Sequence, residues 1–322
     1  MEVVVSIIIP HFNRFELLKE TIASVQNQSF SNWEIIIVDD GSNENEFSSL
    51  KEYIFGCPQI SLAKRTSIFK GPSACRNEGA AMAKGEFLIF LDSDDLITNQ
   101  CLAKRVVFMN SNISLDFAVF TQGIFKEKMG DSNVIFSKFY PSKKEYLENF
   151  ISDNHPWQTT APIWRKNCFQ KLNGFREDYT IMEDPELHMR ALLRNYNFEV
   201  IKDVPDFYYR LLPKNVEETK SFWKNSIIGR VRFFQETLVL LKQYNAWPQY
   251  RSALSKGCFG FIKNMLLYRC NEYPNQLIEI LTWAKMNSLI SSYQLFLIKL
   301  YVRASQKNYF FLKKGMIYKL IN

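Results

Sequence analysis

Three aspartates stand within four residues in the segment Asp92-Ser93-Asp94-Asp95, directly after the apolar run Phe87–Leu91. Carboxylates this close repel one another unless a cation joins them. Mg²⁺ or Mn²⁺, hard ions that prefer oxygen ligands, would join them while also bridging to a diphosphate. A turn or a helix N-cap is the alternative, since aspartate favours both, although one aspartate would suffice for either. The segment therefore favours a site for a metal ion and a phosphate-containing ligand.

Three weaker groups accompany this segment. Asp39 ends an apolar run, where its carboxylate could accept hydrogen bonds from a base edge or a ribose hydroxyl, but Asp39-Asp40-Gly41-Ser42 is also typical of a plain turn. In Pro10-His11-Phe12-Asn13, Phe12 could stack on a ligand or belong to the core. Arg76 could face a nucleotide or be a solvated helix residue. Each of these groups alone is a weak signal.

The elements that must position these groups alternate between strand and helix over the first hundred residues. Continuous apolar runs predict buried strands, and apolar residues at helical spacing predict helices. Such alternation is typical of a parallel sheet with right-handed crossovers, in which ligands bind at the carboxyl ends of strands. The predicted strands are Val3–Ile9, Glu34–Val38, Ile60–Ala63 and Phe87–Leu91, and the helices Glu16–Gln26, Glu46–Phe55 and Pro72–Ala83. Three polar groups follow strands, so we expect one site along one edge.

The remainder of the chain is predicted in two parts. Up to Pro213 the pattern indicates Phe117–Gln122 and Val134–Phe139 as strands that could pair, a helix over Asp184–Leu193, and short strands Phe198–Ile201 and Phe207–Arg210. Beyond it the pattern predicts helices over Phe222–Tyr244, Tyr250–Tyr268, Pro274–Met286 and Ser291–Ser305. We therefore expect an α/β domain over residues 1–213 and an α-helical region over residues 214–322.

Composition narrows the class of protein. With 322 residues, 47% of them hydrophobic, the chain can bury a substantial core. Its six cysteines include no CxxC pair, which argues against a zinc module and for reduced thiols in the cytosol. The first apolar run lacks a basic leader and stops at Pro10, which favours a strand over a signal peptide. No run of about 18 apolar residues predicts a transmembrane helix.

Charge divides the chain unevenly. From Lys214 onward there are 17 Lys and Arg and 5 Asp and Glu, a net charge of +12, which leaves 23 basic and 28 acidic residues before it, a net charge of −5. No acidic residue follows Glu279, and aromatic and basic residues are interleaved over 296–303 and 309–319. An ordinary helical subdomain is one interpretation. We favour attachment to an anionic membrane surface. Nucleic acid is not an expected partner, because no DNA- or RNA-binding motif is present.

Together, the motifs resemble those of the family 2 glycosyltransferases. The resemblance covers about residues 3–212. It rests on Pro10-x-Phe12-Asn13, Gln28-x-x-x-x-Trp33-Glu34 leading into Val38-Asp39-Asp40-Gly41-Ser42, Arg76-Asn77-x-Gly79 followed by Gly85, and Phe90-Leu91-Asp92-Ser93-Asp94-Asp95. It implies a GT-A fold and an inverting, metal-dependent transfer of a sugar from a nucleotide diphosphate donor, foremost a UDP-sugar. The implied acceptor is a glycan or a lipid-linked glycan in surface polysaccharide or glycolipid synthesis, on the cytoplasmic face of the cell membrane.

The resemblance also implies roles for individual residues. The positions that match nucleotide-sugar-binding residues are Pro10, Phe12, Asn13, Asp39, Arg76, Asp92 and Ser93. Pro10 and Phe12 would hold the nucleobase, and Asp39 would bond to it. Asp94, with help from Asp92, would ligate Mg²⁺ or Mn²⁺.

A second acidic motif, Met182-Glu183-Asp184, resembles the Glu-Asp pair of the family. This implies that Asp184 is the general base and that Glu183 lies on the acceptor side. An inverting transfer needs one carboxylate to deprotonate the acceptor hydroxyl. Acidic residues are also favoured at a helix start, so the pair could have that role alone. Trp157, in the segment before it, could stack on the acceptor sugar or lie in the core.

Two other functions compete with this one. A nucleotidyltransferase would need a Gly-rich phosphate loop with Arg and Lys after the first strand, which His11-Phe12-Asn13-Arg14 does not supply. A non-catalytic module of the same fold would bind a nucleotide sugar without turnover. The presence of both Asp94 and Asp184 argues against such a module.

Overall fold

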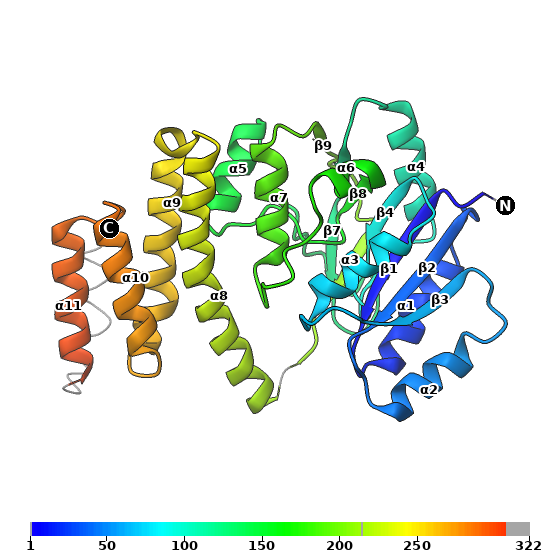
Figure 1. Ribbon diagram of the computed structural model, residues 1–322, viewed down its shortest axis with the longest axis horizontal. Coiled ribbons are helices and arrows are strands. Elements are labelled where there is room, and N and C mark those ends of the chain that lie inside the picture. Colours follow the sequence, from blue (N-terminus) through cyan, green and yellow to red (C-terminus); the bar gives the residue numbers. More distant parts are fainter. Residues whose placement is uncertain (1, 214, 307–322) are drawn as a thin grey trace. The chain divides into compact units, whose positions relative to one another are not determined.

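The computed structural model describes residues 2–213 and 215–306, and the chain forms two compact units (Figure 1). The first unit comprises Met1–Pro141 and Pro156–Lys214, and the second comprises Ser142–His155 and Asn215–Asn322. The chain passes from one unit to the other after residues 141, 155 and 214. The division predicted after residue 213 lies one residue before the third of these points. The segment Ser142–His155, which the sequence analysis assigned to the α/β domain, belongs to the helical unit.

A seven-stranded sheet forms the centre of the first unit, in the order β3-β2-β1-β4-β8-β6-β9. Its strands are β1 (Val5–His11), β2 (Trp33–Asp39), β3 (Ile60–Lys64), β4 (Phe87–Phe90), β6 (Phe117–Val119), β8 (Pro162–Arg165) and β9 (Phe198–Val200). The strands β3, β2, β1 and β4 are parallel, whereas β8 is antiparallel to its neighbours β4 and β6. The expected α/β fold with a mostly parallel sheet is confirmed.

Helices cover both faces of this sheet. They are α1 (Phe15–Gln26), α2 (Glu44–Tyr53), α3 (Pro72–Met82), α4 (Cys101–Ser111), α6 (Lys166–Lys171) and α7 (Glu183–Leu193). Successive residues of a strand point to opposite faces, so Ile7 of β1 shares a core cluster with Leu18 of α1, while Ile8 faces α3. The approach of α3 to β1 requires glycine, because a Cβ atom at Gly79 would overlap Cγ2 of Ile8.

A second, three-stranded sheet contains β5 (Leu96–Ile97), β10 (Phe207–Arg210) and β7 (Gln122–Phe125), with β10 in the centre. The strand predicted over Phe207–Arg210 is therefore confirmed. The strand predicted over Val134–Phe139 is wrong, because only an isolated bridge between Ile135 and Gly123 forms there. β10 pairs antiparallel with β5, which follows the aspartates after β4, so it brings Arg210 close to them.

The second unit is helical, as predicted. Its helices are α5 (Lys143–Ile151), α8 (Val216–Gln243), α9 (Trp247–Phe261), α10 (Pro274–Met286) and α11 (Ser292–Gln306), and a π-helical turn (Ile262–Leu266) and a 3-10 turn (Leu267–Arg269) follow α9. The predicted helix over Tyr250–Tyr268 thus ends as an α-helix at Phe261. In the part of the chain that the structure describes, no helix is long and apolar enough to cross a membrane. The basic, aromatic segment 309–319 lies outside the described residues.

The helix α5 belongs to this unit because it packs against α9. Phe150 of α5 is fully buried. The two backbones come close at Gly257 of α9, where a Cβ atom would lie 2.6 Å from the Cα atom of Ser152. Asp153, directly after α5, accepts a hydrogen bond from Nε of Arg230 on α8 at 2.7 Å. These contacts join residues about 75 to 105 positions apart in sequence, beyond the range of local patterns.

Candidate active site

The carboxyl ends of β1 and β2 lie side by side, because His11 and Asp39 are partners in the parallel register. Asp39 is buried, and its Oδ2 atom accepts hydrogen bonds from the backbone N–H groups of Gly41 and Ser42, both at 3.0 Å. Its Oδ1 atom has no hydrogen-bond partner among the described residues. A buried carboxylate oxygen without a partner is costly unless a ligand supplies a donor. Asp39 thus keeps one oxygen for a ligand, as its predicted role requires.

The other predicted base-binding residues offer different surfaces. Phe12 is 53% exposed, so its ring is available for stacking, and Pro10 is half-buried. Asn13 joins two loops: its Oδ1 atom accepts hydrogen bonds from the backbone N–H (2.9 Å) and Nδ2 (3.0 Å) of Asn43. Its own N–H donates to Oγ of Ser42 at 2.9 Å. The side-chain oxygen of Asn13 therefore connects the loop after β1 to the loop after β2.

Two of the three aspartates after β4 are paired with arginines. Asp92 accepts a hydrogen bond from Nη2 of Arg76 at 2.6 Å, and Asp94 accepts one from Nη1 of Arg14 at 2.5 Å. Burial, and then the negative charge of Asp92, raise the pKa of Asp94 above its ordinary value in spite of Arg14. The carboxyl group of Asp94 therefore holds its proton more tightly than an exposed aspartate does, chiefly because it is buried.

The third aspartate, Asp95, has a structural role. It is buried, and its Oδ1 atom accepts a hydrogen bond from the backbone N–H of Arg210 at 3.0 Å. Arg210 in turn donates from Nε to the backbone carbonyl of Asp94 at 2.7 Å. These bonds fix β10 against the segment after β4, so Asp95 holds the site together. Ser93, a predicted nucleotide contact, is buried within the same segment.

The described residues contain no group of three or more His, Cys, Asp or Glu side chains that could hold a metal ion. They therefore do not form an all-protein metal cage. Mg²⁺ is usually held in another way, by one or two carboxylates together with substrate phosphates and water. Asp92 and Asp94 supply two carboxylates, each of which has, within the described part of the chain, an arginine on only one of its oxygens. These residues fit a metal ion that the protein shares with a diphosphate.

Arg76 of α3 connects this acidic strand end to α7. Its guanidinium group is buried; Nη2 donates to Asp92, and Nη1 donates to Oε1 of Glu183 at 3.2 Å. Although burial opposes the charged form, the carboxylates of Asp92 and Glu183 raise the pKa of Arg76 above its ordinary value. The sequence predicted only that Arg76 lies near the nucleotide. The structure adds that it joins two acidic segments that would otherwise repel each other.

The next residue of α3, Asn77, fixes the loop that leads to α7. Its Oδ1 atom accepts a hydrogen bond from the N–H of Phe175 at 2.9 Å, and its Nδ2 atom donates to the carbonyl of Phe175 at 2.8 Å. Gly174 packs so closely that a Cβ atom there would overlap Oδ1 of Asn77. The Arg-Asn pair thus orients both α7 and the loop before it.

Asp184 lies in the first turn of α7, as predicted. The helix begins after Met182, whose φ of 72° lies in the left-handed region. Burial, followed by the negative charge of Glu183, raises the pKa of Asp184 to about 8 from an ordinary value of 3.8, while Arg76 acts in the opposite direction. A carboxyl group whose pKa lies near the working pH is well suited to general base catalysis.

Trp157, predicted to bind the acceptor, lies in the core instead. Its indole is fully buried, with ring centroids 5.5 Å from His188 and 5.8 Å from Phe198. A ring enclosed in this way has no face for a sugar. Thr159 of the same segment reaches the site, because its side chain lowers the pKa of Asp184 against the larger effect of burial.

Arg14 is the site residue that sequence reasoning missed. It lies in the loop after β1, and its partly exposed side chain pairs with Asp94. Its position in the sequence could have indicated this role. Arg14 directly follows Pro10-His11-Phe12-Asn13, so it lies at the same edge of the sheet as the aspartates.

Comparison with known proteins shows to which family the chain is similar. The family profile described as Glycosyl transferase family 2 matches residues 6–171. Poly(ribitol-phosphate) beta-N-acetylglucosaminyltransferase TarP of Staphylococcus aureus is 34% identical over 253 residues, which cover 77% of this chain and 74% of TarP. UDP-Glc:alpha-D-GlcNAc-diphosphoundecaprenol beta-1,3-glucosyltransferase WfgD of Escherichia coli is 31% identical over 198 residues, which cover 61% of this chain and 72% of WfgD. Two other relatives are matched over only 43% and 32% of their lengths.

Among solved structures, S. aureus TarS 1–349 in complex with UDP-GlcNAc resembles this chain with a TM-score of 0.67 and 20% sequence identity. The likeness covers 98% of this chain and 92% of that one. At this level of identity the comparison establishes a common fold, and that fold is the expected GT-A type.

Proposed function

The chain belongs to glycosyltransferase family 2, and from this membership we propose that it transfers a sugar from a UDP-sugar, with inversion, to a glycan or a lipid-linked glycan. The observation that carries the proposal is the bridge made by Arg76 between Asp92 and Glu183. This bridge brings the first turn of α7, with Asp184, to the aspartates after β4. A base for the acceptor and carboxylates for the donor thus share one site.

We assign the donor to the edge formed by β1, β2 and β4. Oδ1 of Asp39 would accept a hydrogen bond from the base, and the exposed ring of Phe12 would stack on it. The choice of uridine is supported by the UDP-Glc in the name of WfgD and by the UDP-GlcNAc bound to TarS.

Asp94 and Asp92 would hold Mg²⁺ or Mn²⁺ together with the diphosphate. When bound, such an ion neutralises the charge that develops on the departing diphosphate. Arg14 and Arg76 each hold one oxygen of these carboxylates in place, which leaves the second oxygen of each for a ligand.

Asp184 would act as the general base. As the acceptor hydroxyl oxygen bonds to the anomeric carbon, the bond from that carbon to the diphosphate breaks on the opposite side. UDP leaves with the bonding electrons, and the hydroxyl proton passes to the Asp184 carboxylate. Thr159 and Glu183 orient and tune this carboxyl group. General base catalysis of this kind contributes about 10²–10⁴-fold to the rate.

The acceptor class is inferred from the relatives. TarP acts on poly(ribitol-phosphate), and WfgD acts on a sugar linked to diphosphoundecaprenol, as their names state. Both acceptors carry phosphate. We therefore propose a phosphate-containing glycan or lipid-linked glycan as the acceptor, modified on the cytoplasmic side of the membrane, where UDP-sugars are made.

The test is release of UDP from a panel of UDP-sugars, with and without Mn²⁺, in the presence of poly(ribitol-phosphate) or a diphosphate-linked sugar with a short lipid chain. NMR of the product gives the anomeric configuration, which should be inverted. Retention of configuration would contradict the mechanism. Binding of UDP without turnover of any donor would favour a non-catalytic module. Formation of UDP-sugar from UTP and a sugar phosphate would favour a nucleotidyltransferase.

A further inference from the structure

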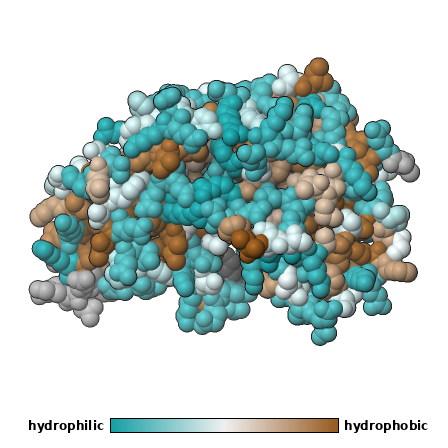
Figure 2. Space-filling model, viewed as in Figure 1, coloured by the Kyte–Doolittle hydropathy of each residue, from teal (hydrophilic) through white to brown (hydrophobic). Residues whose placement is uncertain are grey.

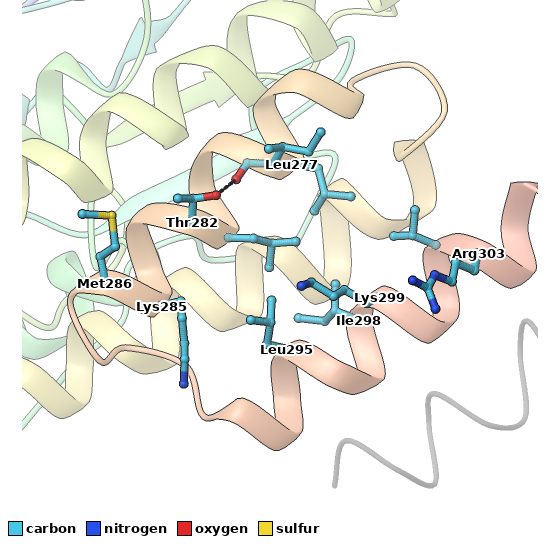
Figure 3. A pocket seen from close by; sticks show the side chains of 11 residues that line it. Leu277, Thr282, Lys285, Met286, Leu295, Ile298, Lys299 and Arg303 are labelled. Carbon is cyan, nitrogen blue, oxygen red and sulfur yellow. Dashed lines mark hydrogen bonds between the residues drawn. The ribbon is translucent and has the colours of Figure 1, made fainter.

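A groove between α10 and α11 of the helical unit has a volume of about 560 Å³ (Figure 3). This is within the range of about 300–1,000 Å³ that is typical of small-molecule sites. Its apolar lining includes Leu277 and Leu281 of α10 and Leu295, Ile298 and Val302 of α11. Such a lining suits a hydrocarbon chain better than a sugar or a nucleotide.

Three cations accompany this apolar lining: Lys285, Lys299 and Arg303. All three are exposed. Among the described residues, neither Lys299 nor Arg303 has an ion pair with an acidic side chain, and Lys285 donates only to Oγ of Ser292 at 2.7 Å. The last acidic residue of the chain is Glu279, which accepts a hydrogen bond from Gln235. The charge of the groove is therefore positive and unbalanced.

A second apolar surface lies on α11 beyond these cations. Tyr293, Phe296 and Leu300, spaced three and four residues apart, are 60%, 61% and 40% exposed. At 100° per residue, Lys299 and Arg303 lie between this stripe and the groove-lining residues of the same helix. Around α11 the order is therefore apolar groove, cations, apolar stripe. Figure 2 shows hydrophobic surface among hydrophilic residues at the left of the view, where Figure 1 places α10 and α11.

We propose that this surface of α10 and α11 docks on a membrane leaflet that contains anionic phospholipid. One acyl chain lies in the groove, the lipid phosphate lies between Lys299 and Arg303, and Phe296 enters the interface beside them. The charge complementarity selects an anionic lipid. An apolar groove whose cations have no acidic partner among residues 2–213 and 215–306 matches an apolar chain below an anionic headgroup. The sequence after residue 306 adds four lysines and no acidic residue. This docking is independent of the proposed sugar transfer, which belongs to the other unit.

The full chain is tested by co-sedimentation with vesicles of phosphatidylcholine alone or mixed with phosphatidylglycerol. Binding should require the anionic lipid. A basic residue near such a surface changes partitioning by about fivefold, so Lys299→Gln with Arg303→Gln should weaken binding about 25-fold at low salt. The matched control is Lys242→Gln with Lys256→Gln, two exposed lysines of α8 and α9 with the same change of net charge. The control should change binding by less than about twofold.

A second pair of variants separates groove occupancy from charge alone. Ile278→Lys places a cation on an exposed groove residue, and Val239→Lys places one on an equally exposed residue of α8. Salt near 1 M shortens the screening length to about 3 Å, so the binding that remains depends on apolar contacts. Ile278→Lys should lower this salt-resistant binding, whereas Val239→Lys should not.

Three outcomes would overturn the proposal. They are equal binding to neutral and mixed vesicles, an equal loss in both lysine pairs, and salt-resistant binding by Ile278→Lys that is not lower than that by Val239→Lys. A change of mass in light scattering that follows the same variants, without a change in vesicle binding, would show that the surface joins copies of the chain instead. UDP release by the same variants is measured in parallel with a water-soluble acceptor, which does not require membrane docking. A variant that loses vesicle binding but keeps UDP release has lost docking and not catalysis.

Discussion

The environment of Asp184 opposes its ionised form, although a general base must lose its proton to act. Burial and Glu183 raise the pKa of this carboxyl to about 8, so its base form increases with pH through the neutral range. We expect kcat/KM to rise about tenfold per pH unit below that value and to level off above it. The measurement is kcat/KM from about pH 5.5 to 9.5. A profile that is flat down to pH 5.5 would show that Asp184 is already ionised at neutral pH.

Asp184→Asn tests the same residue by substitution. The amide is nearly isosteric and cannot accept the proton, so kcat should fall about 10²–10⁴-fold while UDP affinity stays close to that of the wild type. Loss of UDP binding would instead assign Asp184 to the nucleotide site. Normal turnover would mean that another group, such as Glu183, is the base.

The same substitution should stabilise the fold. Because the pKa of Asp184 is raised on folding, the unfolded chain gives up the proton near pH 4 and the folded chain keeps it to about pH 8. The carboxyl group therefore costs stability at neutral pH, and this cost disappears below the unfolded pKa. Asp184→Asn should raise Tm at pH 7, by about 1.5 °C for each kcal/mol of this cost in a chain of 322 residues. The gain should vanish in a melt below about pH 4.

Asp94 is the residue on which metal dependence should rest. Asp94→Asn removes the charge of one proposed ligand but keeps the shape of the side chain. It should abolish the additional thermal stabilisation by UDP that Mn²⁺ provides, because Asp92 alone supplies too little charge. Asp131→Asn, in an exposed turn of the same unit, is the control for the loss of one carboxylate. Unchanged Mn²⁺ dependence in Asp94→Asn would remove Asp94 from the metal site.

Single residues could be predicted where their position in the chain decides their role. Asp39 and Asp92 follow buried strands of one parallel sheet, so the sequence alone puts them at one edge. Asp95 and Trp157 could not be assigned in this way, because their roles depend on Arg210 and His188, which come much later in the sequence. The bridge from Arg76 to Glu183 depends in the same way on how α3 meets α7.

At the scale of elements, the contact between α3 and β1 supports the site from behind. Gly79→Ala would force a methyl group against Ile8, and overpacking of this kind costs about 1–3 kcal/mol. Because α3 carries Arg76, the shift should also weaken UDP binding. Gly260→Ala in α9 is the matched control: no atom lies within 4 Å of its added Cβ atom, so it should stabilise by about 0.5–1 kcal/mol. Chemical denaturation and UDP titration measure both. Equal stability of the two variants would contradict the packing argument.

The elements that were predicted well are those with a strong local pattern. Three of the four parallel strands, β1, β2 and β4, contain runs of consecutive apolar residues. The helix α10 has the predicted bounds, with proline at its first position. The strand predicted over Val134–Phe139 does not form, because its apolar residues do not specify the strand with which it would pair. The end of α9 at Phe261 was not predicted either, because the change to a π-helical turn leaves the spacing of apolar residues almost unchanged.

At the scale of the whole molecule, a chain that ends at Pro213 should not fold as a separate catalytic domain. It would keep α5 but lose α9, and Phe150 with the rest of the buried face of α5 would be exposed to water. We expect this shortened chain to aggregate or to unfold without a cooperative transition, as seen by light scattering and circular dichroism. A soluble chain with a sharp transition would show that α5 does not need its helical partners.

The passage of residues 142–155 through the second unit also restricts how such enzymes can be recombined. Consider a hybrid of two such enzymes in which only the part after residue 214 is exchanged. In this hybrid, α5 from one enzyme would have to pack against α9 from the other. The close approach at Gly257 makes that junction sensitive to a single methyl group. A hybrid that combines this catalytic unit with the C-terminal region of another enzyme therefore also needs the segment of that enzyme that corresponds to residues 142–155. The two segments have to be exchanged together.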